Sequence, residues 1–433
     1  MNKTRAIILG ASGRDFHNFN TLFRNNKDYE IVCFTQAQLP VESSLYPMEL
    51  SGKLYPKGIP IYKEENLEKI IEKNNVNIVF LSYSDLSHNE VMNLASRSLS
   101  CGASFSLISP DLTMLESSKP VIAVCATRTG AGKSPMTEYI SLYYKSKGKK
   151  VGVVRHPMPY GDLVEQEVQK FSSLKDLDLH NCTLEEREDY ERHILNGINL
   201  YSGIDYSKIL NLAEKENDIL IWDGGNNDTP FFVPDLYITI ADASRSNHEI
   251  TFHPGETNFR MCNIIAINKW EKNPKGLKVI EKNSKECNPN ADVIKMSMDF
   301  KISDEKLIKK NKKVLLIEDG PTITHGHLSH GLAYIIAKKK GCKIIDPRKH
   351  AKGFYKKIYE NYKHIGPVIP AVSYSKSQLN SLSSLVKSCK PDLIISATPT
   401  DLRNIMKFTV PFVNVTYSMK RNNELNKALE KLL

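Results

Sequence analysis

The feature that most limits what this chain can fold into is an apolar run, Val121–Ala126, followed by the sequence Thr-Gly-Ala-Gly-Lys-Ser at positions 129–134. The run predicts a buried strand, and the glycines predict a loop whose backbone N–H groups can close on phosphate oxygens. In such a loop Lys133 reaches the β- and γ-phosphates of a nucleotide and Ser134 holds Mg²⁺. The alternative is a glycine turn with a surface lysine, but the strand before it and the helix signals after it favour a phosphate loop.

The loop departs from the full phosphate-loop pattern at one position. That pattern has an earlier glycine where this chain has Thr127. The variant resembles the compact loops of the dethiobiotin-synthetase and MinD-like ATPases. Arg128 stands where many of those proteins have a second lysine. We therefore predict a catalytic role for Arg128 beside Lys133.

Length and composition predict a soluble, cytoplasmic protein of two or three domains. The chain has 433 residues, of which 41% are hydrophobic and 25% charged, and its net charge is +10. No apolar run approaches the roughly 20 residues of a membrane helix. The eight cysteines form no C-x-x-C pair, which favours free thiols in a reducing cytosol. Because no basic motif is interleaved with aromatic residues, we expect a small anionic substrate, no nucleic acid and no membrane, and a homo-oligomer is compatible with these features.

Short β-branched runs alternate with amphipathic helical stretches along the whole chain. This alternation predicts an α/β protein with parallel sheets, whose strands are buried on both faces. We divide the chain into a Rossmann-like N-terminal domain (residues 1–117), a P-loop NTPase domain (118–312) and a C-terminal α/β segment (313–433). The last segment either completes the central sheet or forms a third lobe.

The first predicted strand, Ala6–Leu9, leads into Gly10-Ala-Ser-Gly-Arg-Asp15. A G-x-x-G turn between a strand and a helix suits close helix packing and anion binding. The third glycine of the dinucleotide pattern is replaced by Asp15, so a nicotinamide cofactor is not supported. A phosphorylated ligand and a tight structural turn both remain open.

An acidic residue at the end of another buried strand is expected in a protein that transfers phosphoryl groups, because Mg²⁺ needs an oxygen ligand there. The run Ile219–Trp222 delivers Asp223 to a glycine turn. We predict that Asp223 has a catalytic role and holds Mg²⁺ together with Ser134.

The strand Ile264–Ile267 ends in Asn268-Lys269-Trp270-Glu271, which resembles the N-K-x-D element that reads guanine in GTPases. Glutamate keeps the charge of the final aspartate but is one methylene longer, which leaves adenine open, so the expected nucleotide is ATP or GTP. A simple turn at the strand end is the alternative. The predicted nucleotide-binding residues are Thr129, Gly130, Ala131, Gly132, Lys133, Ser134, Asn268, Lys269 and Glu271.

Three charged loops lie next to predicted strand ends, where parallel sheets gather their ligands. Arginine binds phosphate or carboxylate through two N–H groups, so the two arginines of these loops are candidates for a substrate clamp. The histidines at positions 325, 327 and 330 have no nearby acidic partner, which favours phosphate binding by His325 over a metal site. The predicted substrate-binding residues are Arg155, His156, Glu256, Arg260, Asp319 and His325.

Several motifs together resemble one known family. They are G-A-S-G-R-D-F-H-N-F-N, T-R-T-G-A-G-K-S, V-R-H-P-M-P-Y-G-D-L, I-W-D-G-G-N-N-D, P-G-E-T-N, E-D-G-P-T and H-I-G-P-V. Over nearly the whole chain the sequence resembles a prokaryotic family of predicted GTPases labelled cyclic 2,3-diphosphoglycerate synthetase-like. The resemblance implies an ATP-dependent closure of a phosphoanhydride within 2,3-diphosphoglycerate. It also implies that Gly130–Ser134 binds the nucleotide and that Asp223 organises Mg²⁺, whereas Glu271 departs from the usual aspartate.

The resemblance and the residues agree on an enzyme that uses a nucleoside triphosphate and Mg²⁺ to act on a small phosphorylated acid. One alternative is a regulatory or metallochaperone-type GTPase, whose output is a conformation bound to a partner protein. A small-molecule kinase is another, and it would use almost the same residues. The charged loops favour an enzyme, whereas the element ending in Glu271 mildly favours the GTPase.

Overall fold

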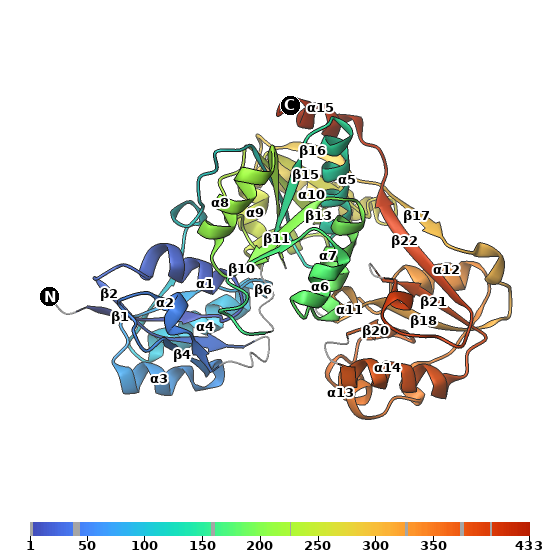
Figure 1. The fold of residues 1–433 in the computed structure, drawn as a ribbon, viewed down its shortest axis with the longest axis horizontal. Helices are drawn as coiled ribbons and strands as arrows, with labels where there is room; N and C mark the ends of the chain where they lie inside the picture. The colour runs from blue at the N-terminus through green and yellow to red at the C-terminus, as the bar shows by residue number, and fades with distance from the viewer. Residues whose placement is uncertain are drawn as a thin grey trace. The chain divides into compact units, whose positions relative to one another are not determined.

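The computed structural model describes residues 3–37, 44–156, 161–225, 227–324, 328–372, 376–398 and 401–433 (Figure 1). The chain forms two compact units. The first comprises Met1–Ser172, Gly197–Met296 and Asn422–Leu433, and the second comprises Ser173–Asn196 and Ser297–Arg421. In the described part of the chain, every helix is too short or too polar to span a bilayer.

The N-terminal sheet of the first unit has the Rossmann-like arrangement that alternation of strands and helices predicts. Its described strands lie in the order β3-β4-β2-β1-β5-β7 and are parallel except for the pair β3 and β4. The chain runs outward from the central strand β1 and returns on its other side with β5, so the order reverses between these two strands. The elements are β1 (Thr4–Leu9), α1 (Arg14–Asn18), β2 (Tyr29–Gln36), β3 (Leu45–Tyr46), α2 (Met48–Ser51), β4 (Ile59–Lys63), α3 (Leu67–Asn74), β5 (Ile78–Leu81), α4 (His88–Ser100) and β7 (Ser104–Leu107).

The second sheet of this unit carries the predicted phosphate loop. Its described strands lie in the order β10-β11-β9-β12-β8-β13-β15-β16, and only β10 runs antiparallel to its neighbour. The strands are β8 (Val121–Ala126), β9 (Val151–Arg155), β10 (Val168–Phe171), β11 (Asn199–Gly203), β12 (Ile219–Asp223), β13 (Leu236–Asp242), β15 (Ile264–Asn268) and β16 (Asp292–Lys295). The central strands are buried on both faces, which explains why they appear in the sequence as unbroken apolar runs.

Helices cover both faces of this sheet, and the C-terminus returns to it. The helices are α5 (Lys133–Ser146), α8 (Tyr206–Glu216), α9 (Gly255–Met261), α10 (Pro274–Cys287) and α15 (Asn423–Glu430). Tyr144 of α5 is buried and donates a hydrogen bond of 2.7 Å to the carbonyl oxygen of Leu429. The two sheets of the unit are joined by a short antiparallel pair, β6 (Leu86–Ser87) with β14 (Phe252–His253). This pair brings the carboxyl end of β5 to loops of the phosphate-loop sheet.

The second unit has a sheet of its own with a separate apolar core. Its described strands lie in the order β17-β22-β21-β18-β19, and β20 also pairs with β18. The C-terminal strands therefore do not complete the central sheet. The elements are α6 (Leu174–Leu179), α7 (Leu184–Leu195), β17 (Met298–Ile302), β18 (Lys313–Asp319), α11 (Gly320–Ile323), α12 (Leu332–Lys339), β19 (Lys343–Ile344), α13 (Gly353–Asn361), β20 (Ile369–Ala371), α14 (Lys376–Cys389), β21 (Leu393–Ala397) and β22 (Phe412–Met419).

The predicted fold class is confirmed: the chain is an α/β protein with predominantly parallel sheets, and a phosphate-loop sheet follows a Rossmann-like one. The predicted domain boundaries at 117/118 and 312/313 stay predictions. The two compact units group the first two sheets together and place residues 173–196, which form α6 and α7, in the second unit.

Candidate functional site

The loop between β8 and α5 has the geometry of a phosphate loop. Gly130 and Gly132 have φ angles of 75° and 117°, which side chains other than glycine rarely adopt. A Cβ atom on Gly132 would also lie 2.5 Å from the side-chain nitrogen of Asn268. Lys133 is the first residue of α5, so the amino-terminal end of this helix, with its partial positive charge, points to the loop and suits an anion there.

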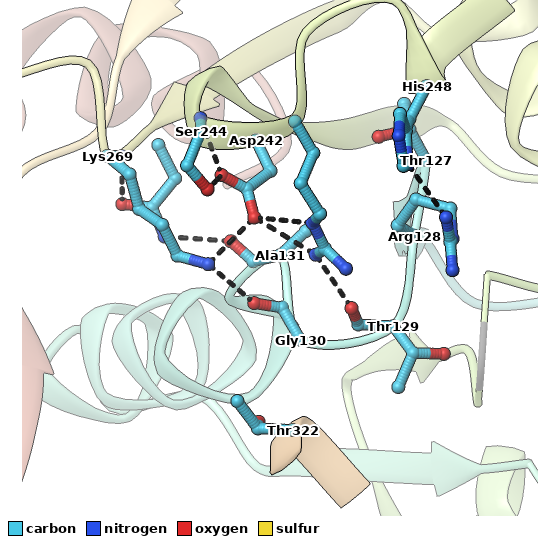
Figure 2. A network of polar contacts seen from close by, with 12 residues as sticks. Thr127, Arg128, Thr129, Gly130, Ala131, Asp242, Ser244, His248, Lys269 and Thr322 are labelled. Carbon is cyan, nitrogen blue, oxygen red and sulfur yellow. Dashed lines mark hydrogen bonds and ion pairs between the residues drawn. The ribbon is translucent and has the colours of Figure 1, made fainter. Parts of the chain in front are cut away.

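The carbonyl oxygens of the loop are held from behind by side chains of two neighbouring strand ends (Figure 2). The amide of Asn268 donates to the oxygen of Ala131 at 2.7 Å, and Lys269 donates to the oxygen of Gly130 at 3.1 Å. Arg245 donates to the oxygen of Thr129 at 2.8 Å. The carbonyl oxygens of three successive loop residues are thus held by side chains. In this structure Asn268 and Lys269 therefore shape the phosphate loop.

Asp242, at the end of β13, holds the two cations of this network in place. Its carboxylate lies 2.7 Å from Nζ of Lys269 and 2.9 Å from the guanidinium of Arg245. Burial opposes ionisation of this side chain, but Lys269 and Arg245 hold the pKa of Asp242 below its ordinary value. Figure 2 shows the contact of Asp242 with Lys269 and that of Lys269 with the carbonyl oxygen of Gly130. Sequence reasoning missed Asp242 and Arg245, although they follow an apolar run at the same sheet edge as the loop.

Glu271 lies three residues after Asn268, on the turn that follows β15, and its side chain is exposed. Its predicted role in reading the nucleotide base stays a prediction.

Asp223, the predicted magnesium ligand, ends β12, which pairs directly with the phosphate-loop strand β8. It is buried and forms an ion pair of 3.1 Å with Arg155, which lies opposite it at the end of β9. Arg155 also lies within 3.4 Å of the carbonyl oxygens of Asp223 and Gly224. The structure thus places Arg155 beside Asp223, the candidate magnesium ligand, where it holds the carboxylate in position.

The chemistry of the donors fits Mg²⁺. One carboxylate and the hydroxyl of Ser134 suit a cation that keeps several waters and takes phosphate oxygens as its other ligands. No group of three or more histidine, cysteine or acidic side chains suited to a metal ion occurs within the described residues.

Arg128 is turned to the loops of the Rossmann-like sheet. Its Nε donates to Asp85 at 2.7 Å, its Nη1 lies 2.7 Å from Nδ1 of His248, and its guanidinium lies 3.7 Å from the ring centre of Phe252. Arg128 and Asp85 are both largely buried. The contacts show an anchored side chain, and the predicted catalytic role of Arg128 stays a prediction.

A second polar cluster lies beside Asp223. Asp228 is almost fully buried, and its Oδ2 lies 2.6 Å from Nε2 of His156. Ser84, which follows β5, donates a hydrogen bond to the same carboxylate, and Nε of Arg14 lies 3.6 Å from its Oδ1. Burial opposes ionisation of Asp228, but His156 and Arg14 hold its pKa below the ordinary value. Of the predicted substrate residues, His156 is thus placed in a cluster that joins both sheets.

The other predicted substrate residues lie elsewhere. Arg260 is half-exposed in the last turn of α9 and pairs with Glu256 at 2.6 Å, and Glu256 lies 3.4 Å from Nε2 of His88. The first residue of α9, Gly255, packs against the carbonyl of Thr127 beside the phosphate loop, so Arg260 is at the far end of this helix. The structure gives Arg260 a surface ion pair, and its predicted role in binding substrate stays a prediction.

Asp319 lies in the second unit at the end of β18. It is partly buried, desolvation raises its pKa to about 6, and Thr322 donates a hydrogen bond to it. His325 lies outside the described residues.

Asn258 is a further residue that sequence reasoning missed. It is fully buried in α9 and donates to the carbonyl oxygens of Ala126 at 3.2 Å and Asn227 at 2.6 Å. These bonds tie the end of β8 to the loop that follows Asp223. The motif Pro-Gly-Glu-Thr-Asn contains Asn258 and could have indicated it, but only the charged residues of this loop were predicted to have a role.

The fold and the loop define a protein that binds the phosphates of a nucleotide at the carboxyl edge of a parallel sheet. No protein-family model matches the chain. The sequence is 48% identical to the arginine synthetase ArcE of Thermococcus kodakarensis over 434 aligned residues, which cover 99% of this chain and 97% of that protein. The chain belongs to the family of this synthetase, which confirms the prediction of an enzyme.

Solved structures resemble the chain only distantly. LpxK from Aquifex aeolicus in complex with ATP has a TM-score of 0.43 and 13% identity, covering 74% of this chain and 90% of its own. FlhF complexed with GMPPNP and Mg²⁺ has a TM-score of 0.28 and 13% identity, covering 48% of this chain and 76% of its own. The label cyclic 2,3-diphosphoglycerate synthetase-like is not confirmed by these comparisons.

Proposed function

We propose that this protein is a synthetase that forms arginine at the expense of a nucleoside triphosphate, with Mg²⁺ as cofactor. The observation that carries the proposal is the 48% identity, over 99% of the chain, to a protein named arginine synthetase. The phosphate loop supports the use of a nucleotide, because its carbonyl oxygens are tied back and its helix begins with Lys133.

The chemistry of arginine suggests which bond is made. Arginine differs from its ureido analogue by a nitrogen in place of the oxygen on the guanidino carbon. Transfer of a phosphoryl group to that oxygen makes it a leaving group. A nitrogen nucleophile then adds to the carbon and loses a proton, and phosphate departs. Lys133 stabilises the charge that develops between the β- and γ-phosphates during the transfer. Because the γ-phosphoryl group is transferred and then leaves as phosphate, the products are a nucleoside diphosphate, phosphate and arginine.

The other candidate functions use the same loop. Closure of cyclic 2,3-diphosphoglycerate needs cations for two phosphates and a carboxylate, but Arg155 and Arg260 are paired with Asp223 and Glu256. The element ending in Glu271 mildly favours the regulatory GTPase, but the 48% identity to a protein named arginine synthetase supports the synthetase over it and over the small-molecule kinase. A cytoplasmic location, the choice of ATP and a homo-oligomeric state stay with the proposal as expectations.

The test is a reconstitution with purified protein. The protein is incubated with Mg²⁺, ATP or GTP, the ureido analogue of arginine and an ammonium salt, and arginine is measured by amino-acid analysis while phosphate is followed by ³¹P NMR. We expect arginine, nucleoside diphosphate and phosphate in equal amounts, and none of the three with Lys133→Ala. Formation of a cyclic phosphoanhydride from 2,3-diphosphoglycerate without any arginine would contradict the proposal.

A further inference from the structure

Four buried side-chain atoms of residues that follow β1 and β12 have no hydrogen-bond partner in the described part of the chain. They are Oδ1 of Asn18, Oδ1 of Asn227, Oδ1 of Asp228 and Nε of Arg14. The last two face each other at 3.6 Å, which is longer than a hydrogen bond. Buried polar atoms are nearly always paired, so a group of orphans requires an explanation.

The four atoms belong to one continuous polar region. The amide nitrogen of Asn18 donates to Ser82 at 2.9 Å, and Ser84, two residues along the same loop, bonds the carboxylate of Asp228. Asn227 precedes Asp228, and its amide nitrogen donates to the carbonyl oxygen of Thr127 at 3.2 Å. The region therefore extends from the end of β5 to the beginning of the phosphate loop.

The topology makes this region a place where a ligand is expected. The order of the Rossmann-like sheet reverses between β1 and β5, and open α/β sheets bind ligands beyond the carboxyl ends of the strands at such a point. Arg14 follows β1 and Ser84 follows β5, whereas Asn227 and Asp228 follow β12 of the other sheet. Two strand edges thus contribute to one region.

The region does not suit a phosphate. Oδ1 of Asp15 accepts the backbone N–H groups of Ser12, Gly13 and Phe16 at 2.7–3.1 Å, so the anion-binding donors of the glycine turn are already engaged. Burial lowers the pKa of His253 to about 4, so this neighbour is neutral at pH 7. Three of the four orphan atoms are oxygens that accept hydrogen bonds, and one of them belongs to a carboxylate. Such a surplus of acceptors suits a ligand that is rich in N–H groups.

We propose that Asn18, Asn227 and Asp228 bind the guanidino or ureido end of the amino-acid ligand, with their oxygens accepting its N–H groups. The inference rests on the proposed function, which supplies a ligand of this kind. It adds a location: the reacting carbon lies at the junction of the two sheets of the first unit. Nε of Arg14 faces the same place and can donate to the oxygen of a ureido group.

Titration calorimetry with L-arginine tests the site separately from turnover. We expect Asn18→Leu and Asp228→Asn to weaken arginine binding at least tenfold, while the affinity for the nucleotide stays within twofold of the wild type. Asn18→Leu keeps the size of the side chain, and it gives the decisive result if Asp228→Asn fails to fold. Asn74→Leu, at a partly buried asparagine near the end of α3, is the matched control and should bind arginine as the wild type does.

The outcomes separate the site from the function. If folded Asn18→Leu and Asp228→Asn bind arginine as the wild type does, the inference is overturned, and the proposed function stands as long as the wild type still makes arginine. An equal loss of nucleotide binding would indicate a general structural role and would also overturn the inference. If the wild type itself neither binds nor makes arginine, the proposed function is contradicted, and so is the inference that rests on it.

Discussion

The first unit contains two glycine loops with the same layout, and they differ in whether a carboxylate of the chain itself accepts the backbone N–H groups of the loop. In each, a buried parallel strand runs into glycines and then into a helix: β1 into Gly10–Arg14 and α1, and β8 into Gly130–Gly132 and α5. In the first loop, Oδ1 of Asp15 accepts three backbone N–H groups, so the chain supplies its own anion. In the second, Lys133 begins the helix, the first turn of the helix has no acidic residue, and side chains hold the carbonyl oxygens of the loop.

The comparison shows that glycines specify the shape of such a loop and that the residues after them specify its use. A carboxylate at the start of the helix fills the anion position from within. In the second loop, Lys133 and Ser134 stand at the start of the helix, and we expect them to bind a phosphate and a metal ion there. The first loop is therefore a structural joint, and its Arg14 reaches to the other sheet.

The largest expected effect on activity is at Lys133, because Lys133 stands at the start of the helix after the second loop, where the first loop has a carboxylate. Loss of its ammonium removes roughly 3–4 kcal/mol of transition-state stabilisation. Lys133→Ala should therefore lower kcat for nucleotide turnover by about 10² or more. Lys147→Ala, at an exposed lysine just after α5, is the control and should retain wild-type turnover. Unchanged turnover in a folded Lys133→Ala protein would remove the basis of the comparison.

The next effect is the pH dependence that Asp15 contributes to stability. Burial raises the pKa of Asp15 to about 6, so the folded state binds this proton more tightly than the unfolded state does. The stabilisation is complete below the ordinary pKa of an aspartate and is lost as pH rises through about 6. The shift corresponds to about 3 kcal/mol, at about 1.4 kcal/mol per pKa unit.

Asp15→Asn isolates this contribution, because its remaining oxygen can accept the same three N–H groups without titrating. Urea unfolding of both proteins between pH 4 and 7 should show the wild type losing stability relative to the variant as pH rises. A difference in unfolding free energy that does not change with pH would mean that the first loop carries no buried anion.

A smaller effect is expected at Asp242, which supports the second loop from behind. Asp242→Asn removes the charge that holds Lys269 and Arg245, so the carbonyl oxygens of Gly130 and Thr129 lose their fixed partners. Nucleotide affinity should fall about tenfold, or about 1.4 kcal/mol, as measured by titration with a fluorescent nucleotide. Asp292→Asn, at an exposed aspartate of β16, should leave the affinity unchanged. Wild-type affinity in Asp242→Asn would show that the loop holds its shape without this support.

The difference between the two loops also shows what the sequence could and could not predict. Strands β8, β12 and β15 were predictable because strands buried on both faces are continuous apolar runs. Asp223 was found as the polar residue that ends such a run. The roles of Asp15 and Arg14 were not predictable, because they depend on three-dimensional contacts. Arg14 bonds the carbonyl oxygen of a residue 215 positions away, and Asp15 turns back on its own loop.

The same reason explains why the ion pairs of the predicted substrate arginines could not be predicted from the sequence. Arg155 and Arg260 were expected to share a substrate, yet each has a carboxylate close by, in one case across a strand pair and in the other one helical turn away. A sequence shows that an arginine follows a strand, but it does not show which carboxylate lies within reach. Residues 173–196 form α6 and α7 and belong to the second compact unit, which the sequence analysis did not predict.

The smallest expected effect concerns the base of the nucleotide. Asn268 and Lys269 are engaged by the second loop and by Asp242, and Glu271 is exposed and one methylene longer than the aspartate that reads guanine in the related element. We therefore expect ATP to bind at least as well as GTP. Glu271→Ala should change either affinity by less than threefold, or about 0.7 kcal/mol. Competition of ATP and GTP against a labelled nucleotide measures this, with Glu286→Ala, at an exposed glutamate of α10, as the control. A tenfold preference for GTP that Glu271→Ala abolishes would show that this element reads the base, and the second loop would then belong to a GTP-dependent enzyme.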